Sequence, residues 1–325
     1  MKHITRRTVL ATALTLATLS AGVAMAQANY PDKPIRMVIA FPPGGPTDLV
    51  ARVLAQKLTE QMGQPVVVDN KPGANGNIAA ELVTKAPSDG YTLFYNTSAV
   101  ALSPALYKKM SYDVRADFAP VALTAVIPLV LAVHPSLPVN TVQEFVQYAK
   151  ANPDKLSYGS AGNGTTPHVG GELFKQNTGI FATHIPYRGA APAIQDVMAG
   201  QIDYAFAPGT VFQSVKAGKL KLLAVASHKR TDNYPSAPTV EEEGFGKVYV
   251  DTPFAIYAPA AMPQAQVMRM NREVNRLLAM PAIKARFAEF GADAQPLSPA
   301  ELKALVQAEI ALFGPVIRKS GIKAD

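Results

Sequence analysis

The chain has 325 residues, of which 48% are hydrophobic, and this supplies enough apolar surface for the cores of two domains. It contains no cysteine, which excludes disulfides, thiolate metal sites and a cysteine nucleophile. The net charge is +7, but the basic residues form no stripe interleaved with aromatic side chains, so we expect no nucleic-acid partner.

The first 26 residues have the composition of a cleaved export signal. Lys2, Arg6 and Arg7 precede an uncharged stretch that ends in the small-residue cleavage pattern Ala24-Met25-Ala26. We therefore expect residues 1–26 to be removed and the mature protein to be soluble outside the cytoplasm. The paired arginines fit the twin-arginine route as well as the general secretory route, and both alternatives remain open.

An apolar strand predicted at residues 35–41 ends in the turn Pro42-Pro43-Gly44-Gly45 and is followed at once by a helical pattern that extends to Met62. The first N–H groups of such a helix have no partner within the helix, and the helix dipole adds partial positive charge at the same end. The turn contains neither a Walker A motif nor G-x-G-x-x-G, so it does not imply a nucleotide. It predicts an anion site, for which a carboxylate is the natural guest.

Strand, polar turn and helix then occur twice more. Strands are predicted at residues 65–69 and 91–95, and Asn77 is predicted to cap the intervening helix, which runs to about Lys85. This order is typical of a parallel sheet, in which ligands bind beyond the carboxyl ends of the strands. Asp48 lies beside the first turn, although its carboxylate suits a helix N-terminus and would repel a bound anion. The candidate ligand residues of this half are Phe41, Pro43, Gly44, Gly45, Thr47, Asp48, Asn96, Thr97 and Ser98.

A second series of the same kind begins with an apolar strand at residues 129–133. Thr141, with Glu144 three residues later, predicts the capped start of its first helix. A glycine-rich loop spans residues 159–168, and a further polar turn follows the strand predicted at residues 183–187. The candidate ligand residues of this half are Ser160, Ala161, Gly162, Asn163, Gly164, Thr165, His168, Tyr187, Arg188, Gly189, Pro208 and Gly209.

The last part of the chain is predicted to be helical. Pro263 lies at the start of one helix, and Ser298 with Glu301 forms a capping box at the start of another, which runs to about Lys319. The stretch from Thr252 to Pro259 is expected to cross back to the first domain. We therefore predict a discontinuous lobe 1 (residues 27–128 and 253–325), a lobe 2 (residues 129–252) and a hinge near residues 128 and 252.

Several short motifs match a known family in the expected order along the mature chain. They are Tyr30-Pro31-Asp32-Lys33-Pro34-Ile35, Phe41-Pro42-Pro43-Gly44-Gly45, the stretch from Gly63 to Ala74, Asp89-Gly90-Tyr91-Thr92-Leu93, Tyr158-Gly159-Ser160-Ala161-Gly162, Pro186-Tyr187-Arg188-Gly189, Gly200-Gln201-Ile202-Asp203 and Gly218-Lys219-Leu220. With these motifs the chain resembles the Bug-type periplasmic solute receptors, the binding components of tripartite tricarboxylate transporters.

The resemblance implies an α/β fold with two lobes, the type II periplasmic binding protein or Venus-flytrap fold, each lobe a mainly parallel sheet flanked by helices. It implies a small carboxylate held mainly by backbone amides and ordered water, then delivered to membrane subunits of the transporter. We expect a monomer without cofactor. The chain departs from the family pattern at residues 207–210 and 252–256, which leaves the identity of the carboxylate open.

Each candidate residue also has a purely structural interpretation. The glycines and hydroxyls serve equally well as turns and helix caps, and the loop at residues 160–166 as a surface loop. Arg188 is either a clamp on a carboxylate or a solvated side chain, and Tyr187 either a donor or a packing wall. His168 is expected in the first turn of a helix, where it supports the loop. His134, His184 and His228 have no metal-ligand spacing, so we predict no metal.

The sequence leaves three functions open. They are a receptor that delivers its ligand to a transporter, a ligand-loaded receptor that signals to a membrane sensor, and an exported hydrolase or transferase of small acids. The enzyme is disfavoured because Gly159-Ser160-Ala161-Gly162 does not match the Gly-x-Ser-x-Gly elbow and no other catalytic motif is present. We predict a non-catalytic receptor in which the Gly44-Gly45 turn and the loop at residues 160–166 face each other across a cleft.

Overall fold

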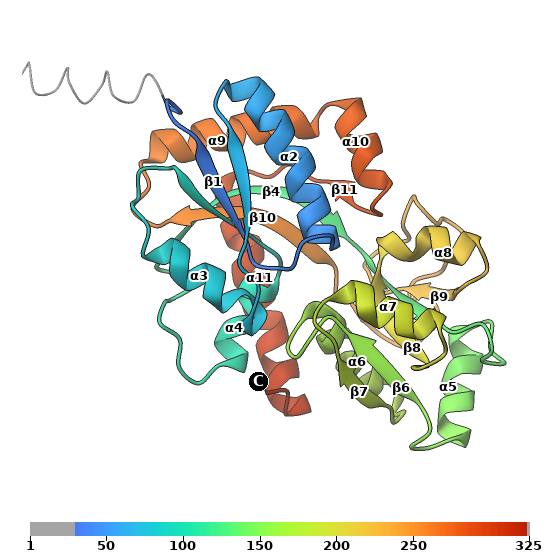
Figure 1. Ribbon diagram of the computed structural model, residues 1–325. Helices are drawn as coiled ribbons and strands as arrows, with labels where there is room; N and C mark the ends of the chain where they lie inside the picture. The colour runs from blue at the N-terminus through green and yellow to red at the C-terminus, as the bar shows by residue number, and fades with distance from the viewer. Residues whose placement is uncertain (1–29, 324–325) are drawn as a thin grey trace, which may run out of the picture.

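The computed structural model describes residues 30–323 (Figure 1). The predicted export signal and its cleavage site lie outside the described residues. The described chain forms two sheets, each covered by helices on both faces, with the strands of the second sheet inserted in sequence between those of the first.

The first sheet has the strand order β11-β4-β10-β3-β1-β2. Its central strand is buried on both faces, because Ile35, Met37 and Ile39 pack into one core cluster and Val38 into the other. Helices α2, α9 and α10 cover the first face, and α3, α4 and the start of α11 cover the second. The elements of this half are β1 (Ile35–Ile39), α2 (Pro46–Met62), β2 (Val66–Asn70), η1 (Ala74–Gly76), α3 (Asn77–Thr84), β3 (Thr92–Asn96), α4 (Ala99–Leu106), β4 (Phe118–Ile127), β10 (Thr252–Pro259), α9 (Gln264–Leu278), α10 (Pro281–Ala288), β11 (Asp293–Ala294) and α11 (Pro299–Ser320).

The second sheet has the strand order β7-β6-β8-β5-β9. Helices α5 and α6 pack on one face, and α7, η2 and α8 lie over the other. Its elements are β5 (Leu129–Val133), α5 (Val142–Ala151), β6 (Ser157–Ser160), α6 (Thr166–Thr178), β7 (Thr183–Pro186), α7 (Ala190–Met198), β8 (Tyr204–Pro208), η2 (Gly209–Val211), α8 (Phe212–Lys216) and β9 (Lys221–Val225).

The predicted α/β architecture with two lobes is confirmed, but both sheets are mixed rather than mainly parallel. The parallel pairs are β1 with β2 and β3, and β6 with β7 and β8. The strands at the crossings between lobes run the other way: β10 is antiparallel to β3 and β4, and β5 is antiparallel to β8 and β9. The two strands that enter a sheet directly from the other lobe, β5 and β10, therefore run opposite to the parallel strands, which sequence patterning within one unit does not reveal.

The two crossings lie side by side between the lobes. Only Pro128 separates the end of β4 from the start of β5, and the returning β10 places Thr252 opposite Ile127. Figure 1 shows β4 and β10 passing together from the first sheet toward the second. The hinge near residues 128 and 252 stays a prediction.

Helix α11 contacts both lobes. Its first half packs against the first sheet through Leu302 and Val306, whereas Phe313 and Ile317 belong to the core cluster of the second sheet. The Nε2 of Gln176 on α6 donates to the hydroxyl of Ser320 at 2.5 Å. The end of the chain therefore lies against the second lobe, although its sequence position follows the first.

Two of the predicted helix caps are present and one is wrong. Thr141 accepts from the Glu144 amide, and Ser298 and Glu301 form the reciprocal capping box of α11. Asn77 is the first residue of α3 rather than its cap. Gly76 occupies the cap position in a left-handed conformation, and the Asn77 side chain instead accepts a hydrogen bond from Tyr112.

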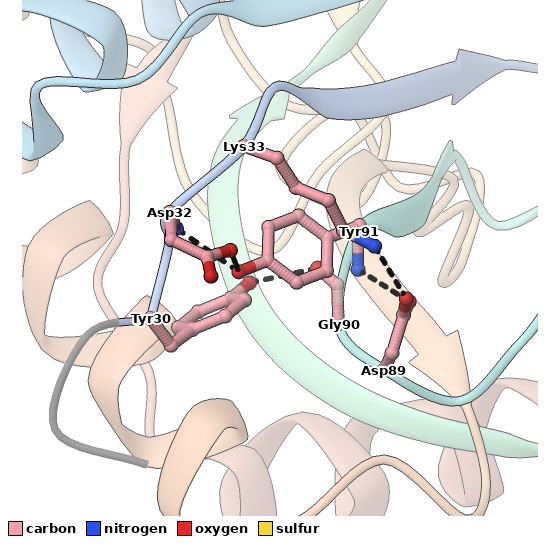
Figure 2. A network of polar contacts seen from close by, with 6 residues as sticks. All are labelled: Tyr30, Asp32, Lys33, Asp89, Gly90 and Tyr91. Atoms are coloured by element: carbon pink, nitrogen blue, oxygen red, sulfur yellow. Dashed lines mark hydrogen bonds and ion pairs between the residues drawn. The ribbon is translucent and has the colours of Figure 1, made fainter. Parts of the chain in front are cut away.

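The first described residues are attached to the turn before β3 (Figure 2). The Tyr30 hydroxyl donates to the Gly90 carbonyl at 2.7 Å, and the Tyr91 hydroxyl donates to Asp32 at 2.5 Å. Lys33 pairs with Asp89 at 3.0 Å and lies over the Tyr91 ring. The family motifs at residues 30–35 and 89–93 thus contact each other at the end of the sheet opposite to the candidate ligand residues. We therefore assign them a structural role.

Candidate functional site

A cavity of about 350 Å³ lies between the two lobes. The first lobe contributes the turn after β1, Thr97 after β3, and residues at the ends of the crossing strands. The second lobe contributes the loops that lead into α6 and α7, together with Pro208 at the end of β8. The volume is at the small end of the range for small-molecule sites.

Three helices begin at this cavity. Gly45, Thr165 and Gly189 are the N-cap residues of α2, α6 and α7, and all three line it. Within residues 30–323, no side chain caps the first amides of these helices. Unpaired N–H groups and the positive ends of three helix dipoles therefore converge on one volume, which favours an anion without using side-chain charge.

Arg188 is the one charged side chain among the residues that line the cavity. It is exposed, and within residues 30–323 it makes no hydrogen bond or ion pair. It immediately precedes the N-cap of α7 and therefore adds a full positive charge to a site that is already favourable for an anion.

Asp48 holds the turn after β1 in place but does not line the cavity. Its carboxylate is 2% exposed and accepts hydrogen bonds from the Gly44 amide at 3.0 Å, the Arg52 Nε at 2.8 Å and the Asn70 Nδ2 at 2.9 Å. Burial alone would raise the pKa of Asp48, but these donors hold it below its ordinary value. The Gly44 amide is therefore already used, and the turn offers the amides of Gly45 and Thr47 instead.

A hydrogen-bond network behind the cavity holds the second-lobe loop. The Ser160 hydroxyl lies 2.7 Å from the His184 Nε2 and accepts from the Gly162 amide, and the Thr165 hydroxyl donates to the Gly162 carbonyl. The His168 Nδ1 accepts from the Gly164 amide at 3.1 Å. Burial lowers the pKa of His168 to about 4, so near neutral pH the ring is uncharged and able to accept. His168 lies in the first turn of α6, as its position in the sequence predicts.

The structure brings most of the candidate residues together. A second compartment of about 480 Å³ shares Phe41, Pro42, Ala161, Thr165, Arg188 and Gly189 with the 350 Å³ cavity. The candidates that line one or both are Phe41, Pro43, Gly44, Gly45, Thr47, Thr97, Ala161, Gly162, Asn163, Thr165, Arg188, Gly189 and Pro208. Those that line neither are Asp48, Asn96, Ser98, Ser160, Gly164, His168, Tyr187 and Gly209.

The residues outside the cavity hold its walls in place. The Asn96 side chain accepts from the Thr97 amide, and the Ser98 hydroxyl donates to Glu309 at 2.6 Å. The Tyr187 hydroxyl donates to Asp196 at 2.6 Å, so the ring packs beside the loop rather than offering its donor to a ligand. Gly209 lies backbone to backbone against Gly291 of the first lobe.

Among the lining residues that the sequence candidates omit, two groups come from other parts of the chain. One comprises the strand residues Ile127, Leu129, Thr252 and Phe254, of which only the last two lie in the stretch at residues 252–256 that departs from the family pattern. The other is the turn from Gly73 to Gly76 in the second compartment, where Asn75 has a left-handed φ of 50°. The Asn75 Nδ2 donates to the Gly164 carbonyl of the other lobe at 3.3 Å, and its Oδ1 is buried with no hydrogen-bond partner among the described residues. The glycines at the carboxyl end of β2 were the available signal.

Neither a membrane-spanning helix nor a metal-binding cluster occurs among the described residues. No helix there combines the length and the apolar composition that a membrane crossing needs. Between residues 30 and 323 there is also no group of three or more histidine, aspartate or glutamate side chains arranged to hold a metal ion.

Comparison with known proteins gives consistent matches over almost the whole chain. The family described as tripartite tricarboxylate transporter family receptor matches residues 50–322. The protein BugT of Bordetella pertussis (strain Tohama I) is 33% identical over 312 residues, which cover 95% of each chain.

Solved structures agree with the sequence matches. An R. palustris protein with adipate is 35% identical, with a TM-score of 0.85 over 90% of this chain and 99% of its own. MatC from Rhodopseudomonas palustris with bound malate is 30% identical, with a TM-score of 0.81 over 89% of this chain and 100% of its own. The resemblance to Bug-type receptors is thereby confirmed, and the chain belongs to the tripartite tricarboxylate transporter receptor family.

Proposed function

We propose that this protein is a periplasmic receptor that captures a small carboxylate between its lobes, mainly through backbone amides, and delivers it to the membrane subunits of a tripartite tricarboxylate transporter. The observation that carries the proposal is the convergence of the α2, α6 and α7 N-termini on one cavity. Export through residues 1–26, by either route, and action as a monomer without cofactor are part of the same proposal.

Neutral donors are adequate for this task. Removing a carboxylate from water is costly unless hydrogen bonds replace its hydration. A hydrogen bond to a charged group contributes about 1.5–3 kcal/mol, and a helix N-terminus adds about 0.3–1 kcal/mol. Amides from three helix starts therefore offset much of the desolvation, and Arg188 supplements them from an exposed position. The adipate and malate bound by the two R. palustris relatives support a small carboxylate.

Capture requires the lobes to close on the ligand. We place the hinge at residues 128 and 252, with lobe 1 formed by residues 27–128 and 253–325 and lobe 2 by residues 129–252. The hydrogen bond from Asn75 to the Gly164 carbonyl and the packing of Gly209 on Gly291 already join the lobes on two sides of the cavity. A carboxylate held by amides from both lobes would add to these contacts and favour the closed state.

Catalysis is a weaker explanation of the same site. The Ser160 hydroxyl and the His184 Nε2 lie 2.7 Å apart, which resembles the start of a catalytic pair. However, Ser160 is 1% exposed, and neither residue lines either compartment, so a substrate carbonyl has no route to the hydroxyl. Signalling to a membrane sensor uses the same ligand-bound form and remains the alternative destination of the captured acid.

Ligand-induced thermal stabilisation tests the proposal. The mature chain from Gln27, refolded free of ligand, is melted with mono-, di- and tricarboxylates and with their neutral amides. A ligand at 100 times its Kd adds about 2.7 kcal/mol, so at least one acid should raise the Tm by several degrees while its amide does not. No shift with any acid would refute the proposal.

Two substitutions test whether amides or side-chain charge hold the acid. Gly45→Val places a branched side chain at the α2 amides and should weaken binding by at least about 100-fold. Arg188→Ala should weaken it by only about 3–10-fold, because an exposed charge contributes roughly 1 kcal/mol. Lys216→Ala, which removes an exposed cation on α8 outside the cavity, is the control and should leave the Kd unchanged. The reverse ranking of the first two variants would contradict the amide mechanism.

A further inference from the structure

One wall of the cavity is built by the strands that cross between the lobes, β4, β5 and β10, together with the end of β8. Strand pairing places Ile127 opposite Thr252 and Leu129 opposite Pro208, while Phe254 lies two residues beyond Thr252 on the same face of β10. All five residues line the cavity. Ile127, Leu129 and Phe254 are at most 2% exposed. We call this surface the crossing wall.

The crossing wall contains no charged side chain. Arg188, the cation that lines the cavity, precedes α7 in the second lobe, and the three helix N-termini also come from loops rather than from these strands. The cavity therefore has an electropositive side made by helix starts and an apolar side made by strands.

The charged group nearest the crossing wall in sequence is an acid. Asp251 directly precedes Thr252, accepts from the Ser227 hydroxyl at 2.9 Å and interacts electrostatically with Glu309. Asp293, on the strand β11 that pairs with β4, interacts with Asp251 as well, while His228 and Lys229 act on it with the opposite sign. A second ligand carboxylate at this wall would contact apolar side chains, and the negative charges of these acids would repel it.

Thr252 supplies the one polar side-chain atom among the five residues of the crossing wall. The Thr252 hydroxyl is buried and has no hydrogen-bond partner within residues 30–323. A hydroxyl both donates and accepts, so it can satisfy one neutral polar atom of a ligand, but it cannot neutralise a carboxylate.

We propose that the preferred ligand is a monocarboxylate with an apolar body, either a branched or unbranched aliphatic chain or a single aromatic ring, whose carboxylate lies at the helix starts and whose uncharged end contacts the crossing wall. This inference rests on the proposed function of the same cavity and narrows its ligand. Dicarboxylates of similar length become the disfavoured class, because their second charge would be buried without a partner.

Calorimetric titration of the ligand-free mature protein at pH 7.5 compares hexanoate, phenylacetate, adipate and malate, with hexanamide as the uncharged control. Hexanoate and adipate have the same chain length and differ by the second carboxylate. We expect hexanoate or phenylacetate to bind at least tenfold more tightly than adipate, and hexanamide not to bind. Adipate or malate binding as tightly as the monocarboxylates would overturn the inference while leaving the carboxylate receptor intact. Failure of all four acids would overturn both.

A charge placed in the crossing wall should reverse the preference. Thr252→Lys supplies a cation for a second carboxylate and should change the ratio of the adipate and hexanoate Kd values by at least tenfold in favour of adipate. Thr252→Val, of nearly the same shape, is the matched control and should keep the wild-type ratio. If Thr252→Lys folds, as judged by its melting curve, and the ratio does not change, the uncharged end of the ligand does not lie at this wall and the inference is wrong.

Discussion

Replacement of Glu309 by glutamine is expected to stabilise the protein, and increasingly so as the pH rises. Glu309 on α11 is 9% exposed, and its Oε1 accepts the hydroxyl of Ser98 at the start of α4 at 2.6 Å. The pKa of Glu309 is raised to about 8, chiefly by burial and to a smaller extent by the charge of Asp251, while the Ser98 hydrogen bond opposes the shift. Glutamine keeps a carbonyl oxygen for Ser98 and cannot ionise.

The magnitude follows from proton linkage. The pKa of this carboxyl rises from 4.5 to about 8 on folding, so between these values the folded chain binds more protons than the unfolded chain. Stability therefore falls as the pH rises through this window. At about 1.36 kcal/mol per pKa unit, the advantage of Glu309→Gln is about 1 kcal/mol at pH 5, about 3 kcal/mol at pH 7 and about 4 kcal/mol at pH 8. At pH 7 this corresponds to a Tm increase on the order of 6 °C.

Urea unfolding at pH 5, 6, 7 and 8 measures the effect on wild type and variant. Glu289→Gln is the control, because Glu289 is exposed beside Arg286 and such pairs contribute little. Its effect should be small and nearly independent of pH. The reasoning fails if Glu309→Gln destabilises the protein, or if its advantage is the same at all four pH values, since a constant difference would mean that Glu309 is ionised throughout.

Two further substitutions test the turns around the cavity. Gly291→Ala should weaken carboxylate binding at least about tenfold, because the new Cβ would lie 2.4 Å from the backbone of Gly209 across the lobe interface. Gly321→Ala is the control: its φ is also left-handed, but its Cβ would meet no described atom within 4 Å, so binding should not change. Equal effects of the two substitutions on the Kd would contradict this argument. Asp48→Asn should cost about 2 kcal/mol at pH 7, because the amide cannot accept from all three donors that the carboxylate satisfies. Since folding lowers the pKa of Asp48, urea unfolding should show this loss shrinking below pH 3.8, and a loss that persists there would indicate packing rather than charge.

Local sequence patterns predicted the elements that single segments determine. A strand that ends in glycines before an amphipathic helix specifies its own turn, so the start of α2 and the loop before α6 were found from spacing alone. The capping box at Ser298 is equally local. These features depend on contacts within about ten residues, where side-chain chemistry and backbone preference agree.

The rest of the cavity depends on contacts that no local pattern contains. Ile127 and Thr252 are adjacent only because β10 returns antiparallel to β4. In the sequence, the residues of the crossing wall have the apolar pattern of ordinary core strands. They line a cavity only because the two lobes together enclose it. At Gly44 the local pattern predicts a ligand contact that the structure does not offer. Its amide follows a strand and precedes a helix, as an anion donor should, but it already donates to the Asp48 carboxylate four residues later.

The end of the chain limits how the lobes can move. Phe313 and Ile317 on α11 pack in the second-lobe core, whereas Leu302 on the same helix packs in the first. A rigid helix cannot follow both lobes through a large rotation, so the proposed closure near residues 128 and 252 would require α11 either to slide over one core or to bend near its middle. Glu309 lies between these two sets of contacts and holds α11 to the start of α4, beside Thr97 in the cavity lining. Because Ser98 adjoins Thr97 in the cavity lining, we expect ligand affinity, measured by calorimetric titration, to respond to substitutions that break the hydrogen bond between Glu309 and Ser98.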